Sequence, residues 1–155
     1  MTELHEPTSK VLFRVPNEDG TAEIETLWAY DLGDDQYRID NLPFFAYAVS
    51  LHDVVLAPFN ATEGFAAFER VLSKSGNRTI RVIFETPVSE GSESKALLDR
   101  LVSLGVEYEG AHHSYIVLNL PPVVDFDAVV QSLTAAQVQW EHADPSYDQL
   151  HPDVA

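Results

Sequence analysis

The sequence has no cysteine, few basic residues and no long apolar run. Without cysteine there is no disulfide, and no thiolate can act as a nucleophile or a metal ligand. The longest apolar runs, such as residues 42–49, are too short to cross a bilayer. The first ten residues are polar and do not resemble a signal peptide. We therefore expect a cytoplasmic protein.

Basic charge is scarce, since 9 Lys and Arg stand against 25 Asp and Glu and give a formal net charge of −16. Binding to nucleic acid or to an anionic membrane requires clustered cations, so the composition predicts neither partner. Two interpretations of the acidic charge remain open. It keeps the chain soluble, or it steers a basic protein partner toward it.

Motifs of catalysis and metal binding are also missing. The seven glycines form no phosphate-binding loop, and there is no G-x-S-x-G nucleophile elbow. The six histidines show no H-x-x-x-H spacing, and the adjacent His112 and His113 would point to opposite faces of a strand. We therefore expect no metal and no cofactor.

The most informative stretch is residues 36–55, QYRIDNLPFFAYAVSLHDVV. It alternates like a strand over residues 36–40, breaks at Asn41 into an aromatic and aliphatic patch, and restarts as a strand at Val54. Polar residues mark both breaks, with Asn41 at the first and His52 and Asp53 at the second. Such an apolar segment must be buried, so its polar neighbours must find partners or border a cleft.

Residues 1–9 are expected to form a disordered tail, and residues 10–76 a small, bent, antiparallel β-rich subdomain resembling a partial barrel. The predicted strands cover residues 10–15, 22–32, 36–40 and 54–58. A tight turn at residues 33–35 suits positive φ angles. Residues 64–72 fit a further strand because glycines flank them, although a helix over residues 62–73 also fits the apolar spacing.

Residues 77–143 repeat the order strand–helix–strand. Strands are predicted at residues 79–85, 106–109, 114–120 and 137–141. Helices are predicted at residues 93–104, stopped by Gly105, and after Asp125 as N-cap. The order βαββαβ predicts a ferredoxin-like subdomain, four antiparallel strands with both helices on one face. Residues 144–155 are expected to form a loose tail, and the fold class is α+β.

Two sets of residues could carry chemistry. His52 and Asp53 could form an acid–base pair, although neighbours on an extended chain seldom face each other, and Asp53 more often anchors a turn. Glu25 and Arg38 lie on paired strands and could form an ion pair or a clamp for a small carboxylate. Neither set defines a catalytic spacing.

Several stretches together resemble a bacterial family known as domain of unknown function 4265 (DUF4265). They are VLFRV near the start, ETLW, YRIDNLPFFA, SLHDVV and KSGNRTIRV, in the order of the family. The family often has Gly-Asp and Ser-Gly-His, where this chain has His52 and Asn77 at the Gly and His places. A catalytic role of the family's histidine would therefore not carry over to Asn77. The resemblance implies no activity, but it implies that these residues belong to one assembled surface.

Together these features predict a non-catalytic binding protein that holds a partner protein, for example as an inhibitor, an immunity protein or an adaptor. The expected groove lies between the two subdomains and is bordered by Trp28, Asn41, Phe45, His52, Asp53 and Asn77, with Glu25 and Arg38 nearby. The alternatives are a small-metabolite sensor and, third, an enzyme that uses His52 and Asp53. A homodimer through a sheet edge stays open.

Overall fold

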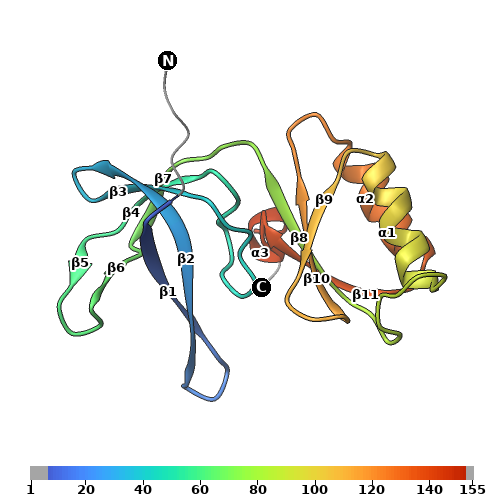
Figure 1. Cartoon of the computed structure of the whole chain (residues 1–155), viewed down its shortest axis with the longest axis horizontal. Helices are drawn as coiled ribbons and strands as arrows, with labels where there is room; N and C mark the ends of the chain where they lie inside the picture. The colour runs from blue at the N-terminus through green and yellow to red at the C-terminus, as the bar shows by residue number, and fades with distance from the viewer. Residues whose placement is uncertain (1–6, 153–155) are drawn as a thin grey trace.

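A computed structural model describes residues 7–152 as a mixed α+β protein built mostly of strands. It contains one curled sheet and one smaller sheet that lie side by side, with an irregular segment between them (Figure 1). Within the described residues no helix is long and apolar enough to cross a membrane. Of the expected N-terminal tail, residues 1–6 lie outside the described residues, and Ser9 already belongs to the first strand.

The curled sheet has seven strands in the order β5-β6-β1-β2-β3-β4-β7. Their bounds are β1 Ser9–Pro16, β2 Ala22–Gly33, β3 Gln36–Ile39, β4 Val54–Leu56, β5 Phe59–Asn60, β6 Phe65–Ala67 and β7 Arg70–Ser73. Asp34 and Asp35 join β2 to β3 with φ angles of 56° and 61°, which confirms the predicted turn geometry. The inward side chains of β1 and β2, among them Val11, Phe13 and Leu27, form the buried core of this sheet.

Residues 64–72 form neither the single strand nor the helix that the sequence allows. They form β6 and β7, which lie toward opposite ends of the sheet and are separated by Phe68 and Glu69. The amide of Phe68 donates to the carbonyl of Leu12, and the amide of Glu69 donates to that of Leu56. The chain therefore crosses from one end of the sheet to the other, and the sheet must curl. The expectation of purely antiparallel pairing is wrong for β6, which runs parallel to β1.

The second sheet has four strands in the order β11-β8-β10-β9, and all its pairs are antiparallel. The elements follow one another as β8 Arg78–Ile83, α1 Glu93–Ser103, β9 Glu107–Gly110, β10 Tyr115–Leu120, α2 Phe126–Ala135 and β11 Gln139–Asp144. Both helices cover the face that points away from the curled sheet (Figure 1). Leu98, Leu101 and Leu133 of the helices pack against Ile80 and Leu118 of the strands to form its core.

The helix ends follow the sequence closely. Asp125 caps α2 by accepting a hydrogen bond from the amide of Ala128, as predicted, and Ser92 caps α1 by accepting from the amide of Lys95. Gly105 follows α1 with a φ angle of 103°, a conformation that favours glycine and stops the helix.

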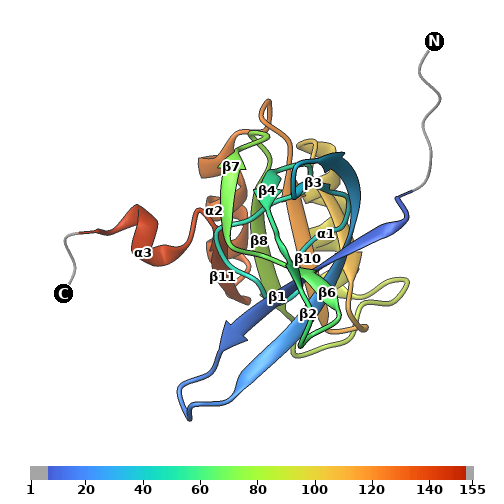
Figure 2. The same cartoon turned by 90° about the vertical axis from the view of Figure 1, so that its left-hand side faces the viewer.

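The expected loose tail from residue 144 is wrong for the described part. Strand β11 continues to Asp144, which is buried, and a short helix α3, Tyr147–Leu150, follows. The Ser146 side chain accepts from the amide of Gln149, and the Gln149 side chain accepts from the amide of Ser146. Figure 2 shows that α3 projects from the side of the two sheets.

Candidate functional site

The space between the sheets is occupied by residues 40–53, here called the central linker. It faces the side of the four-stranded sheet opposite the helices, and that side is polar. Thr79 and Arg81 of β8 and Asn119 of β10 point to it, and each is at most 2% exposed. Polar side chains buried this deeply need hydrogen-bond partners, so the linker and the sheet must be matched in detail.

Glu25 and Arg81 hold the first half of the linker from opposite sheets. The Glu25 carboxylate accepts hydrogen bonds from the amides of Phe44, Phe45 and Ala46 at 2.6, 3.2 and 3.0 Å. The Arg81 guanidinium donates to the carbonyls of Phe45 and Ala46. An acid on one sheet and a base on the other thus bind the same turn of backbone, which fixes the linker between them.

Lys74 ties the second half of the linker to β11. Its Nζ lies 2.5 Å from Oδ2 of Asp53 and 2.6 Å from Oδ2 of Asp144, and both aspartates are buried. Ser50 joins the same network, because its hydroxyl donates to Asp144 at 2.5 Å and lies 2.7 Å from the Thr79 hydroxyl. One cation therefore serves two buried carboxylates, which makes this network the principal ionic contact between the two sheets.

Asn77 and Ser75 lie in the connection between β7 and β8, and their side chains bind the last part of the linker. The Asn77 side-chain amide and the Ser75 hydroxyl both donate to the carbonyl of Leu51, at 3.0 and 2.7 Å. Asp53 also accepts from the amides of Ser50 and Ser75. Asp53 is therefore a structural anchor for the turn before β4. This agrees with the expectation from the sequence that Asp53 anchors a turn rather than acting in an acid–base pair.

Beside the linker lies an open hollow of about 270 Å³, here called the inter-sheet hollow. The linker contributes one wall and strands β9 and β10 contribute the other. Its lining residues are Asp40, Asn41, Leu42, Leu51, Glu107, Tyr108, Glu109 and Asn119. Three of these residues carry carboxylates and none is Lys or Arg, so the hollow favours a cation. Within residues 7–152 no three carboxylates or imidazoles are placed to hold one metal ion.

Asn119 gives the hollow a second polar feature. Its Nδ2 donates to Oε1 of Glu107 at 2.9 Å and to Oδ1 of Asn77 at 3.4 Å, which sets the orientation of the amide. Its Oδ1 is buried and has no hydrogen-bond partner among the described residues. A buried acceptor without a donor costs about 1–3 kcal/mol.

The structure separates the residues that the sequence grouped into one groove. Asn41 lines the inter-sheet hollow, and its Oδ1 accepts from the amide of Trp28 at 2.7 Å. The Trp28 ring lies on the outer face of β2, 42% exposed, beneath the ammonium of Lys10. Phe45 is 40% exposed beside Tyr115. The expected common groove is therefore replaced by the hollow and by separate surface positions.

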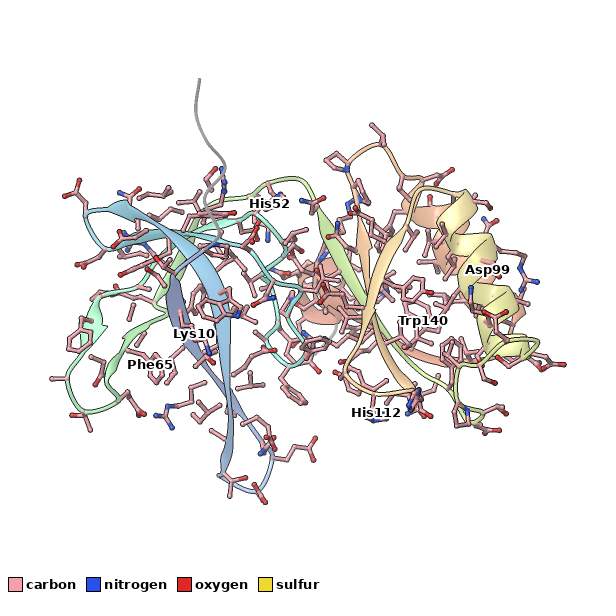
Figure 3. All side chains as sticks on the ribbon, in the orientation of Figure 1. Lys10, His52, Phe65, Asp99, His112 and Trp140 are labelled. Carbon is pink, nitrogen blue, oxygen red and sulfur yellow. The ribbon has the colours of Figure 1, made fainter. Side chains whose placement is uncertain are left out.

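Two pairings that the sequence left open do not form. Glu25 does not meet Arg38, because Arg38 lies opposite Tyr30 in the hairpin and stacks over that ring at 4.8 Å. His52 does not meet Asp53 either. His52 has a φ angle of 69° and turns outward, with Nε2 3.6 Å from Oδ1 of Asp40 (Figure 3). Asp53 points inward to Lys74, so no acid–base pair forms.

Sequence reasoning missed the residues of β9 and β10 that line the hollow. Glu107 and Glu109 are two positions apart on a strand, so their side chains share a face. Asn119 is a lone polar residue in the run YIVLNL, and a polar residue inside an apolar strand is a signal of a required partner. Arg81 in the run TIRVI carries the same kind of signal.

The fold and the site define a two-sheet α+β protein with a polar, hydrogen-bonded interface and an acid-lined hollow beside it. The sequence profile of the family described as "Domain of unknown function (DUF4265)" matches residues 25–143. The chain belongs to this family, which confirms the resemblance seen in the sequence.

The chain also resembles a solved structure described as "Novel crystal structure of a hypothetical protein from Neisseria gonorrhoeae". The TM-score is 0.74 at 19% sequence identity, and the match covers 94% of this chain and 99% of that chain. At this identity the likeness concerns the fold alone. None of the curated proteins matches the chain at a significant level.

Proposed function

We propose that this protein is a non-catalytic binding protein of the cytoplasm that recognises a basic protein partner and takes a Lys or Arg side chain of that partner into the inter-sheet hollow. The observation that carries the proposal is the set of three carboxylates, Asp40, Glu107 and Glu109, in a hollow whose lining includes no Lys or Arg. An inhibitor, an immunity protein or an adaptor would each use such a site.

The chemistry of the hollow selects a cation rich in N–H donors. Asp40, Glu107 and Glu109 offer acceptor oxygens. A guanidinium has five donors in one plane and an ammonium has three, so either group supplies what the hollow lacks. A space of about 270 Å³ is small beside the pockets that hold whole drug-sized ligands, and it suits a single inserted side chain.

The charge of the whole chain supports the same partner. A net charge of −16 attracts a basic protein over a distance and speeds its encounter, mainly at low ionic strength. Binding of this kind weakens as salt is raised, because the Debye length falls to about 8 Å at physiological ionic strength.

A catalytic function has less support in the geometry. Ser50 is fully buried and its hydroxyl is hydrogen-bonded to Asp144, so a substrate cannot reach it as a nucleophile. His52 has no carboxylate oriented on it as a general base would need, since Oδ1 of Asp40 is 3.6 Å from its ring nitrogen.

The proposal is tested with two short peptides of Gly and Ser that carry one central arginine or, as the neutral isostere, one citrulline. The side-chain amide signal of Asn119 is followed by NMR during titration at low and high salt. We expect a saturable shift with the arginine peptide, weaker at high salt, and none with the citrulline peptide. Equal shifts with both peptides, or none with either, would contradict the proposal.

A pair of double variants shows whether the hollow or the overall charge is responsible. Glu107→Gln with Glu109→Gln removes two charges from the hollow. Glu18→Gln with Glu23→Gln removes two exposed charges at the far end of the β1–β2 hairpin. We expect the first variant to lose about tenfold in affinity for the arginine peptide, or about 1.4 kcal/mol, and the second to lose much less.

A small-metabolite sensor is the second candidate. The order β11-β8-β10-β9 with two helices on one face supports the ferredoxin-like assignment of this unit. A second hollow of about 620 Å³ lies at its helix–strand edge, beside Leu97 and Arg100 of α1 and Gln139 of β11. A thermal-shift screen of metabolites tests this candidate, because a ligand of the folded state raises the melting temperature. A stabilising metabolite whose effect disappears in Arg100→Ala would favour it, and a broad library without effect would count against it.

A further inference from the structure

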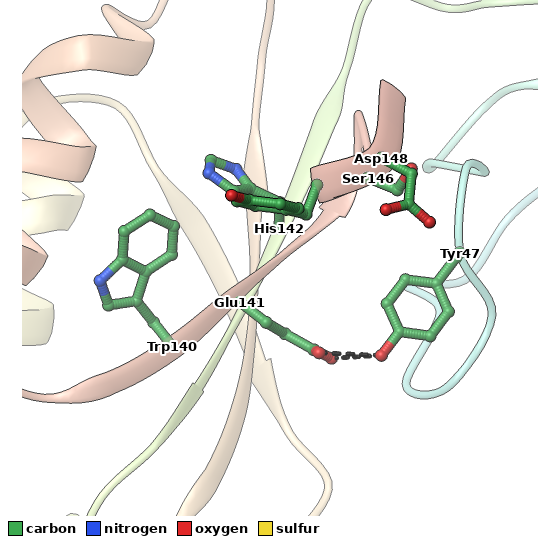
Figure 4. A pocket seen from close by; sticks show the side chains of 7 residues that line it. Tyr47, Trp140, Glu141, His142, Ser146 and Asp148 are labelled. Atoms are coloured by element: carbon green, nitrogen blue, oxygen red, sulfur yellow. Dashed lines mark hydrogen bonds between the residues drawn. The ribbon is translucent and has the colours of Figure 1, made fainter. Parts of the chain in front are cut away.

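A third hollow, of about 690 Å³, opens where β11 leaves the sheet and α3 begins. It is named here the aromatic hollow, because four of its seven lining residues carry aromatic rings. They are Tyr47, Trp140, Glu141, His142, Ser146, Tyr147 and Asp148. In Figure 4, Trp140 and Tyr47 lie on opposite sides of strand β11, and Glu141 points from the strand toward Tyr47. None of the residues that line it is Lys or Arg.

The aromatic walls are held in place by contacts outside the hollow. The rings of Trp140 and His142 meet edge to face, with centroids 4.8 Å apart, and His142 stacks on Phe126 of α2 at 5.7 Å. Tyr147 packs against His151 one turn of helix later. A wall built in this way exists before any ligand arrives, which lowers the cost of binding.

The Glu141 carboxylate is fixed as well. The hydroxyl of Tyr47 donates to both of its oxygens, at 2.8 and 3.0 Å, and Arg81 lies 3.5 Å away on the side of the linker. Since Arg81 offsets part of the charge of Glu141, the exposed Asp148 supplies the remaining negative charge. The hollow therefore combines aromatic rings with carboxylates, and Arg81 already lies over the Tyr47 ring at 4.8 Å.

We propose that the aromatic hollow binds an alkylated ammonium group, the head group shared by choline-like small molecules and by methylated lysine side chains. Ring faces attract a cation through their quadrupole, and quaternary ammonium groups are ligands that aromatic sites recognise in this way. The site goes beyond the proposed function, because its lining shares no residue with that of the inter-sheet hollow, which favours N–H donors.

The test uses the full chain with Trp28→Phe, which leaves Trp140 as the single tryptophan. Its fluorescence is followed during titration with choline chloride, with the neutral isostere 3,3-dimethyl-1-butanol, and with sodium chloride at matched ionic strength. We expect a saturable change with choline and at least tenfold weaker binding of the isostere. No saturable change with choline, or equal binding of the neutral isostere, overturns the proposal.

Two further variants in the same background show where choline binds. Tyr147→Leu keeps apolar bulk but removes a ring, and we expect about a fivefold loss of choline affinity. Phe59→Leu makes the same kind of change at an exposed position on β5, far from the hollow, and should leave the affinity unchanged. Equal losses in both variants would contradict the assignment, as would a large loss in the Glu107→Gln, Glu109→Gln variant.

A peptide with one trimethylated lysine and the same peptide with unmodified lysine then distinguish the two sources of the head group. Tighter binding of the trimethylated peptide than of free choline would indicate a modified protein. A peptide affinity no higher than that of choline would indicate a small molecule. Both results keep the site, whereas stronger binding of the unmodified peptide than of the trimethylated one would refute it.

Discussion

Replacing Lys74 by methionine should strongly weaken the contact between the two sheets. Lys74 holds Asp53 and Asp144, both at most 4% exposed, so its removal leaves two buried carboxylates without a cation. Breaking a buried ion pair from one side costs about 3–5 kcal/mol. Because the Lys74 side chain is 45% exposed and water can replace it in part, we expect the lower end, about 3 kcal/mol.

The assay is urea unfolding followed by circular dichroism. With an m-value of about 2 kcal/mol/M, typical of a domain of this size, a loss of about 3 kcal/mol lowers the midpoint by about 1.5 M. Lys95→Met is the matched control, because Lys95 pairs with Asp99 one helical turn away on the surface. Exposed pairs of this kind contribute little to stability, so its midpoint should hardly move.

A double-mutant cycle with Asp144→Asn separates the ionic contact from the lost packing of the lysine stem. If Lys74 serves mainly to neutralise Asp144 and Asp53, the double variant should be less destabilised than the sum of the two single variants. Similar midpoints for Lys74→Met and Lys95→Met, or strict additivity in the cycle, would refute the reasoning.

Three further predictions follow from single contacts. Glu25→Ala removes the acceptor of three linker amides and should cost about 3 kcal/mol in urea unfolding, whereas Glu25→Gln should cost less because its carbonyl oxygen can still accept. Burial, together with the hydrogen bond to Glu141, raises the pKa of Tyr47 to about 12. In the unfolded chain the phenol ionises near pH 10, so the folded state favours the neutral phenol and loses stability as the pH rises from 10 to 12. Tyr47→Phe should remove this loss and flatten the plot of unfolding free energy against pH in that range. Burial, with a smaller contribution from His151, lowers the pKa of His142 below 6.5. Stability should therefore decline as the pH falls below 6.5, and NMR titration of the His142 ring should give a midpoint below that value; a midpoint above 6.5 would be contrary to this account.

The sequence predicted the helix ends and the hairpin turn well because each of these features depends on a few neighbouring residues. The αL stop at Gly105, the cap at Asp125 and the turn at Asp34 and Asp35 each depend on a few neighbouring residues, and the structure has all of them. The alternation of β8 and β10 likewise places Ile80 and Leu118 in the core beneath the helices.

The contacts between the sheets could not be predicted in this way. Glu25 lies on the buried face of β2, and its partners are backbone amides of the linker, which no side-chain pattern reveals. The pairing of Glu25 with Arg38 failed because the hairpin register places Arg38 opposite Tyr30. Asp144 was assigned to a tail because its partners, Ser50 and Lys74, lie 94 and 70 residues away.

The polar character of the interface between the sheets has a further consequence for the proposed function. Interfaces between units of one chain are commonly more polar than a core, and here Thr79, Arg81 and Asn119 are all buried within one. The linker supplies partners for Thr79 and Arg81, whereas Oδ1 of Asn119 and Nε of Arg81 have no hydrogen-bond partner among the described residues. The binding site is placed at the inter-sheet hollow because three carboxylates line it and no Lys or Arg does.

The central claim is that a basic partner binds at the inter-sheet hollow. The most direct measurement is affinity capture from a lysate of the native host at low salt, with mass spectrometry of the retained proteins. The baits are the unaltered chain, the Glu107→Gln, Glu109→Gln variant and the Glu18→Gln, Glu23→Gln variant.

The account predicts that the unaltered chain and the Glu18→Gln, Glu23→Gln variant retain the same basic protein in stoichiometric amount. High salt should release that protein, and the Glu107→Gln, Glu109→Gln variant should fail to retain it. Recovery of no basic protein, or equal retention by all three baits, would contradict the claim, and the acidic charge would then be explained by solubility alone.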